Sequence, residues 1–220
     1  MRKLYEKAAA ILMFGGIIAF VAYIAYAAVG NALWAEYNPV TTDISSLSAV
    51  GAPNQAALAP LLAIYTACFL LFVTNYLVWS FYSGKSVAFK VGAILLFGMA
   101  LVSSFGYRIF PLEGDKTQMT LQNAMHIVVT VAVVFLSIAA LFLLAVGYRK
   151  TADGRRFGGA LLAASAIFTL LGATNPIGMG AGLNILGLTE RAAIYSLHLI
   201  IGAIGFREGR VMRQRRIEIN

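Results

Sequence analysis

The chain alternates long apolar runs with short polar segments, and this alternation limits its fold more than any single motif. A helix of about 20 apolar residues crosses the roughly 30 Å of a bilayer core, where every backbone N–H and C=O must be bonded within the segment. We therefore expect an all-α, polytopic membrane protein with six transmembrane helices arranged as three hairpins. The expected helices are Lys7–Ala32, Ala56–Tyr82, Lys90–Phe110, Asn123–Tyr148, Phe157–Thr174 and Arg191–Phe206.

The composition supports a membrane protein and explains the basic charge without a nucleic-acid partner. Hydrophobic residues make up 60% of the 220-residue chain and charged residues only 12%, which is too few to cover the surface of a soluble domain. In a soluble protein the net charge of +8 would suggest an acidic partner. Here the positions of the basic residues account for the charge, so we expect membrane lipid as the partner and no nucleic acid.

The basic residues gather on one side of the expected membrane. All 17 Lys and Arg residues except Arg108, Lys116 and Arg191 lie at the two chain ends or in the links after the second and fourth apolar runs. Cytoplasmic segments carry such an excess of Lys and Arg, so we expect both termini in the cytoplasm and the protein in the plasma membrane. Residues 1–206 then form a six-helix transmembrane domain and residues 207–220 a basic cytoplasmic tail.

The polar segments on the opposite side are the expected outer loops, Asn38–Asn54, Pro111–Asn123 and Asn175–Glu190. In the first loop, Asp43 and Ser45 can cap a short interfacial helix, because Asp and Ser side chains accept bonds from free backbone N–H groups. In the third loop, Asn175 and Pro176 are expected to end the fifth helix, because proline interrupts the backbone ladder. The glycine-rich residues 177–188 are then expected to lie in the membrane interface or to dip back into the membrane.

Polar and small side chains inside the expected helices mark contacts between helices. Asn75 is expected to bond to a neighbouring helix, and Cys68 is expected to behave as a small hydrophobe. The last helix carries one stripe of residues at spacings of 4, 3, 4 and 3, namely Arg191, Tyr195, His198, Gly202 and Gly205. Glycines allow close helix approach, so the stripe is expected to face protein and not lipid.

Ionisable groups gather at the outer ends of the helices, where they mark a site or a structural ion pair. Our first hypothesis is a cleft, open to the outer leaflet, that binds a lipid or other amphiphile with an anionic headgroup. Arg108 and Arg191 supply the bidentate donors that such an anion prefers. The other candidate ligand-binding residues are Glu190, Tyr195 and Ser45. Arg108 has two alternative uses, snorkelling to the headgroups or pairing with Glu113 or Asp115.

The second hypothesis is an intramembrane hydrolase or transferase. The candidate catalytic residues are His126 or His198 as general base, with Asp43 or Asp115 orienting the imidazole. A zinc version would use both histidines and a carboxylate, but the chain contains no HExxH and no GxSxG motif, and we expect neither a metal nor a cofactor. The third hypothesis is a structural or assembly protein whose outer charges pair only with each other, and the sequence identifies no protein partner for it.

Three segments, taken in order, resemble one family. They are NPVTTDISSLSAVGAPN after the first apolar run, FPLEGD before His126, and GLTERAAIY leading into the last run. They are similar to the six-helix prokaryotic membrane proteins known as domain of unknown function 998. The resemblance extends from Ala8 to about Phe206. It implies a six-helix topology, and it supplies no activity and no catalytic residues.

Overall fold

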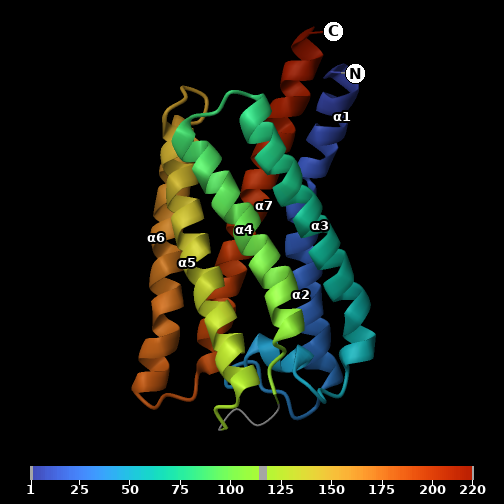
Figure 1. Cartoon of the computed structure of the whole chain (residues 1–220), viewed down its shortest axis with the longest axis vertical. Coiled ribbons are helices and arrows are strands. Elements are labelled where there is room, and N and C mark those ends of the chain that lie inside the picture. Colours follow the sequence, from blue (N-terminus) through green and yellow to red (C-terminus); the bar gives the residue numbers. More distant parts are fainter. Residues whose placement is uncertain (1, 114–117, 220) are drawn as a thin grey trace.

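The computed structural model describes residues 2–113 and 118–219, which form helices joined by short links (Figure 1). The helices are α1 (Arg2–Met13), α2 (Gly15–Leu33), α3 (Gln55–Tyr82), α4 (Val87–Ile109), α5 (Leu121–Arg149), α6 (Arg155–Gly180) and α7 (Leu186–Ile219). A short 3₁₀ helix, η1 (Ile44–Ser48), lies between α2 and α3. The described residues contain no β-strand, so the all-α prediction is confirmed.

Five stretches of the described chain are long and apolar enough to cross a membrane, and they make this a multi-pass helical membrane protein. They are Glu6–Leu33, which covers most of α1 and all of α2, and the helices α3, α4, α5 and α6. Helix α7 is not among them. Its apolar part lies between Glu190 and Arg191 on one side and Arg207 and Glu208 on the other, and the helix continues without a break through the basic residues to Ile219.

The helices from α2 to α7 form a closed ring. Each helix packs against the next in the chain, α4 and α5 most extensively, and α7 closes the ring by packing against α2. Helix α1 packs on α7 and α3. Figure 1 shows both termini at one end of the bundle, together with the α3–α4 and α5–α6 links. We call this the terminal end, and we call the opposite end, where η1 and the α6–α7 link lie, the loop end.

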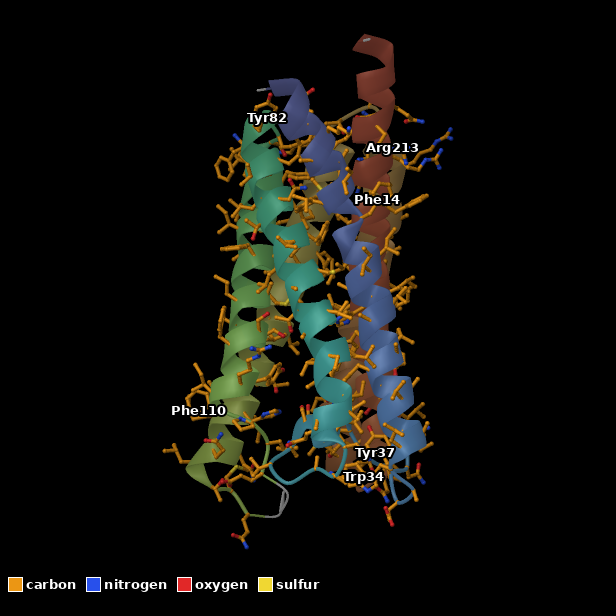
Figure 2. The ribbon with its side chains drawn as sticks, turned by 90° about the vertical axis from the view of Figure 1, so that its right-hand side faces the viewer. Phe14, Trp34, Tyr37, Tyr82, Phe110 and Arg213 are labelled. Carbon is orange, nitrogen blue, oxygen red and sulfur yellow. The ribbon has the colours of Figure 1, made fainter. Side chains whose placement is uncertain are left out.

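Aromatic side chains lie near both ends of the bundle (Figure 2). Trp34 and Tyr37 lie at the loop end, whereas Tyr82 lies at the terminal end beside the start of the chain. Amphipathic rings favour the level of the lipid headgroups, so aromatic residues at the two ends of the bundle are typical of a membrane protein. Within the bundle, the predicted contact of Asn75 is confirmed, because its Nδ2 donates to the Ala9 carbonyl at 2.9 Å.

The first predicted helix is interrupted at Phe14. Around this residue the backbone makes the tighter i to i−3 bonds, from Phe14 N–H to the Ile11 carbonyl and from Ile17 N–H to the Phe14 carbonyl, each 3.0 Å long. Glycine is a poor helix former, and Gly15 and Gly16 follow directly. The predicted span from Lys7 to Ala32 corresponds to the single apolar stretch Glu6–Leu33, which contains this one turn.

The predicted end of the fifth helix at Asn175 and Pro176 is wrong. Helix α6 continues through Pro176 to Gly180, because a proline inside a membrane helix removes only one backbone donor and is tolerated. The helix ends at Gly182, which has a positive φ of 69°. There, Gly182 N–H bonds to the Met179 carbonyl and Leu183 N–H to the Gly178 carbonyl, which is the Schellman arrangement that ends many helices.

Residues 177–188 therefore form no separate segment between the two helices, and their place in the membrane interface stays a prediction. They divide into the last turn of α6, a tight turn, and the first turn of α7, which begins at Leu186. The residue that signals the end of α6 is Gly182, six residues after Pro176, from which the end of the helix was predicted.

Candidate functional site

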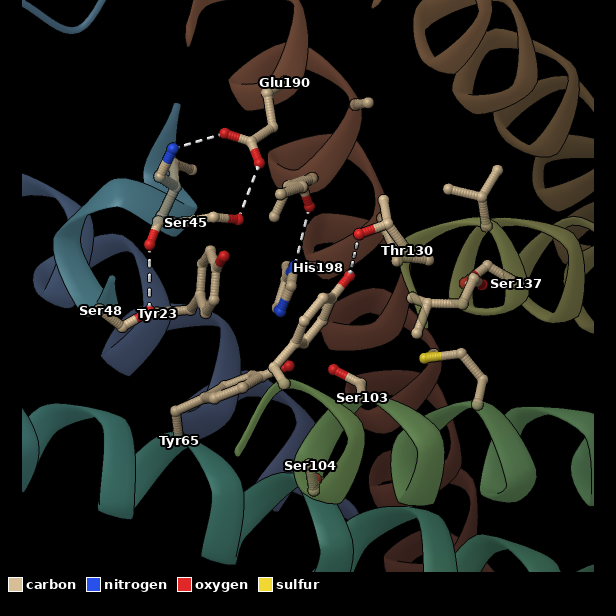
Figure 3. Close-up of a pocket in the computed structure, with 18 of the residues that line it drawn as sticks. Tyr23, Ser45, Ser48, Tyr65, Ser103, Ser104, Thr130, Ser137, Glu190 and His198 are labelled. Carbon is tan, nitrogen blue, oxygen red and sulfur yellow. Dashed lines mark hydrogen bonds between the residues drawn. The ribbon is translucent and has the colours of Figure 1, made fainter. Parts of the chain in front are cut away.

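A cavity of about 710 Å³ lies within the ring of helices, towards the loop end. All the ring helices contribute to its wall, from Tyr23 on α2 to His198 on α7, and Ile44, Ser45 and Leu47 of η1 cover it. Figure 3 shows hydroxyl groups from several helices turned towards this space. Ligand-binding cavities in proteins commonly measure about 300–1,000 Å³, so the cavity has the size of a ligand site.

The cover over the cavity is held by Asp43, which caps η1. The Asp43 carboxylate accepts hydrogen bonds from Ser46 N–H at 3.0 Å and from the Ser46 hydroxyl. Its backbone carbonyl accepts a bond from the Tyr37 hydroxyl at 2.8 Å. The predicted capped helix is confirmed, and the Asp43 carboxylate is directed at the η1 backbone in these contacts, not at an imidazole.

Glu190 and Arg191 join the start of α7 to the same loop. Glu190 accepts hydrogen bonds from Ile44 N–H and, at 3.4 Å, from the Ser45 hydroxyl. Arg191 Nη1 donates to the carbonyls of Pro39 at 2.8 Å, Thr42 at 2.9 Å and Gly187 at 3.0 Å, and Nη2 donates to the Tyr37 hydroxyl. The guanidinium thus binds the loop backbone, outside the cavity wall, and as a ligand for a headgroup Arg191 stays a prediction.

Tyr37 lies between Arg191 and Asp43 and stays protonated across the physiological range. Burial raises the pKa of Tyr37 to about 12, although the neighbouring Arg191 guanidinium acts in the opposite direction. The hydroxyl can therefore accept from Arg191 while it donates to the Asp43 carbonyl. The guanidinium also lies over the Tyr37 ring, 5.3 Å from its centroid. Together these contacts tie the loop to the start of α7.

An Arg191→Ala variant is expected to loosen this cover without unfolding the bundle. Hydrogen bonds from a charged donor contribute about 1.5–3 kcal/mol each, so the loop should lose about 2 kcal/mol or more of local stability, which corresponds to roughly 30-fold faster amide exchange. The measurement is hydrogen exchange at Thr42 and Ile44. An Arg108→Ala variant, which removes a cation from the same end, is the control and should leave both amides unchanged. Equal exchange in the two variants would contradict the claim that Arg191 holds the loop in place.

Both predicted histidines line the cavity, and both bond to backbone. His126 Nδ1 lies 2.9 Å from the Phe110 carbonyl, and its ring lies 4.9 Å from that of Tyr107. His198 Nδ1 lies 2.8 Å from the Ile194 carbonyl, one turn earlier in α7. A catalytic base is commonly oriented by a carboxylate, whereas here a backbone carbonyl orients each ring. Asp115, the other predicted orienting acid, lies outside the described residues.

Arg108 lies in the last turn of α4, and its side chain is exposed and lines the cavity. Its guanidinium has no hydrogen bond or ion pair within the described residues. Glu113, one of its two predicted partners, instead accepts from the Thr120 hydroxyl and donates its N–H to Asn123 Oδ1 at 2.9 Å. The cavity wall therefore carries a cation that has no bonded partner in residues 2–113 and 118–219.

The remaining predicted ligand residues divide between the wall and the core behind it. Ser45 and Glu190 line the cavity. Tyr195 does not line it, and packs against the buried cluster that contains Tyr26, Tyr37 and Leu47. Among the described residues, no group of three or more His, Cys, Asp and Glu side chains is placed to hold a metal ion.

Sequence reasoning missed the tyrosines of the cavity wall. Tyr23, Tyr65 and Tyr107 come from three different helices, and Tyr107 donates to the Thr130 hydroxyl at 3.2 Å. Each tyrosine read alone is an ordinary aromatic residue of an apolar run. The available signal was the spacing of polar residues one turn apart, Ser103 with Tyr107 and His126 with Thr130, which places them on one helix face.

The helices and the cavity together define a class, the multi-pass helical membrane proteins whose helices surround a largely apolar cavity that also carries polar side chains. Residues 17–207 match the family described as a protein of unknown function, DUF998. The chain belongs to this family, and the resemblance seen in its three loop motifs is confirmed. No curated protein and no solved structure matches the chain.

Proposed function

We propose that the protein binds an amphiphile with an anionic headgroup in the ring cavity, from the outer leaflet of the plasma membrane. In this proposal α7 is the sixth transmembrane helix, because it packs along both α2 and α6 within the ring. The pairs α2–α3, α4–α5 and α6–α7 are the three hairpins. Cytoplasmic segments are rich in Lys and Arg, so the terminal end, with both termini, faces the cytoplasm and the loop end faces outwards.

The observation that carries the proposal is the position of Arg108. Arg108 lines a cavity whose wall also contains apolar side chains such as Phe69, Met99 and Ile201. A charged group beside an apolar pocket matches the two parts of an amphiphile, since the guanidinium binds phosphate or carboxylate through paired N–H donors. Snorkelling to headgroups, the alternative use of Arg108, places the same cation at the same membrane level.

The two other hypotheses have less support. A hydrolase would use His126 or His198, and the contacts of both Nδ1 atoms are with backbone carbonyls. A purely structural protein would pair its outer charges with each other. Arg191 fits that description, since its donors bind the loop. Arg108 fits it less well, because it lines the cavity and has no ion pair within the described residues.

An Arg108→Ala variant is expected to retain anionic lipid about tenfold less well than the wild type, because it loses charge-assisted hydrogen bonds of about 1.5–3 kcal/mol. The measurement is native mass spectrometry of protein incubated with phosphatidylglycerol and, separately, with phosphatidylcholine. An Arg108→Lys variant, which keeps the charge but not the fork of donors, should show intermediate retention.

The matched control is Arg155→Ala, which removes an exposed cation at the terminal end. It should retain phosphatidylglycerol as the wild type does. Equal retention of phosphatidylglycerol by the wild type and Arg108→Ala would overturn the proposal, and so would equal retention of the two lipids by the wild type.

A further inference from the structure

His198 lines the cavity, is buried, and has one ring nitrogen without a hydrogen-bond partner among the described residues. The residue is only 5% exposed, and Figure 3 shows its ring beside Tyr23 and above Tyr65, with one ring nitrogen bonded to the backbone and the other pointing away from that bond. The Tyr23 ring stacks on it with centroids 4.3 Å apart, and the Tyr65 and Phe69 rings lie at 5.3 and 6.4 Å. Three aromatic rings therefore fix the orientation of the imidazole.

The free nitrogen, Nε2, is a hydrogen-bond acceptor. Because Nδ1 bonds to the Ile194 carbonyl, Nδ1 carries the proton, and a neutral imidazole then has a lone pair on Nε2. Nε2 is buried and has no partner among the described residues. An unsatisfied buried polar atom is rare in native proteins because it forfeits its hydrogen bonds with water. His198 is one of the residues that line the cavity, so a ligand bound there is the available partner for this nitrogen.

We propose that the ligand of this cavity carries a hydroxyl group that donates a hydrogen bond to Nε2 of His198. This inference rests on the proposed binding function and adds a second polar group to the ligand. A hydroxyl fits better than an ammonium group, because His198 is buried and the burial of a charged donor is far more costly than that of a neutral one.

The positions of Arg108 and His198 set the spacing of the two groups on the ligand. Glu190 bonds to η1 at the loop end, and His198 lies eight residues further along α7, on the order of 10 Å deeper at 1.5 Å per residue. Arg108 lies in the last turn of α4, at the loop end. The ligand thus has an anionic group near the loop end, an apolar chain, and a hydroxyl group part-way along that chain.

The test compares stearate with hydroxystearates that carry the hydroxyl next to the carboxylate, at mid-chain, or near the methyl end. Affinities for the full-length protein in detergent are measured by displacement of a fluorescent fatty acid. The mid-chain form should bind the wild type about fivefold to tenfold more tightly than stearate, the gain of one buried hydrogen bond. The other two forms should bind no better than stearate, because their hydroxyls stay unpaired.

Two substitutions assign the effect to His198. His198→Phe keeps an aromatic ring beside Tyr23 but removes the acceptor, so the preference for the mid-chain hydroxyl should disappear. His198→Gln restores an acceptor at a similar reach and should recover part of the preference. If no hydroxystearate binds the wild type more tightly than stearate, the inference is overturned while the proposed function stands. If His198→Phe keeps the preference, the inference is overturned as well. If stearate itself does not bind in an Arg108-dependent way, both are overturned.

Discussion

An Arg207→Ala variant should be less stable than the wild type by about 3–5 kcal/mol, the usual cost of leaving a buried charge without its counter-ion. Glu208 is 0% exposed, and its carboxylate accepts a hydrogen bond from Arg207 Nη1. Lys85 Nζ lies further away, 4.0 Å from the second carboxylate oxygen. Removing the guanidinium therefore leaves the carboxylate with one distant cation.

Arg207 is itself held by aromatic rings and an acid at the terminal end of the bundle. Its guanidinium lies 4.7 Å from the Tyr148 ring centroid and 5.2 Å from that of Phe157. Its Nη2 lies 3.6 Å from an Asp153 carboxylate oxygen. These contacts join α7 to α5, α6 and the link between them, so the effect of the substitution should be global and not confined to the end of α7.

The measurement is chemical unfolding in detergent micelles, with Arg210→Ala as the control. Arg210 is on the same helix but exposed, and it contacts only the Phe206 ring among the described interactions, at 5.6 Å. The double variant Arg207→Met with Glu208→Leu removes both charges and should recover most of the lost stability. If Arg207→Ala proved as stable as Arg210→Ala, the claim that Arg207 neutralises the buried Glu208 carboxylate would be contradicted.

Gly205→Ala should lower the stability of the protein and Gly202→Ala should not, although the two residues are one turn apart on α7. A Cβ atom at Gly205 would lie 2.5 Å from the Met13 carbonyl oxygen, which is backbone and cannot move aside alone. At Gly202 the nearest atom would be Phe20 Cβ at an ordinary 3.7 Å. Overpacking costs about 1–3 kcal/mol, whereas replacing a helical glycine by alanine without a clash gains up to about 1 kcal/mol.

The same unfolding experiment measures this pair, and each variant is the control for the other. Gly205→Ala should separate α7 from α1 and lower the midpoint of unfolding, while Gly202→Ala should match or exceed the wild type. A destabilisation of equal size in both variants would contradict the close approach at Gly205.

Much of the fold follows from local sequence signals. The apolar runs placed the helices, Asp43 indicated the capped η1, and the stripe from Arg191 to Gly205 indicated the face of α7 that packs on protein. Each of these signals acts within one or two helix turns, through backbone hydrogen bonds or side-chain spacing. The end of α6 was misplaced because Pro176 and Gly182 both signal a helix end, and in the membrane the Schellman turn at Gly182 decides it.

The site was only partly predictable, because its contacts join residues far apart in the chain. The sequence places both Arg108 and Arg191 near the loop end. It does not show that Arg191 donates to the carbonyls of Pro39 and Thr42, or that Arg108 lines the cavity. Likewise, the sequence placed His198 on a protein-facing stripe, and only the packing of α2 and α3 against α7 shows which aromatic rings surround it.

The most direct test of the binding proposal is an electron cryomicroscopy map of the protein in nanodiscs that contain phosphatidylglycerol. We expect elongated density within the ring of helices, with its polar end within hydrogen-bond distance of the Arg108 guanidinium and its chain against Phe69 and Met99. A cavity that is filled only by water, or a lipid density that contacts Arg108 solely from outside the ring, would contradict the proposal.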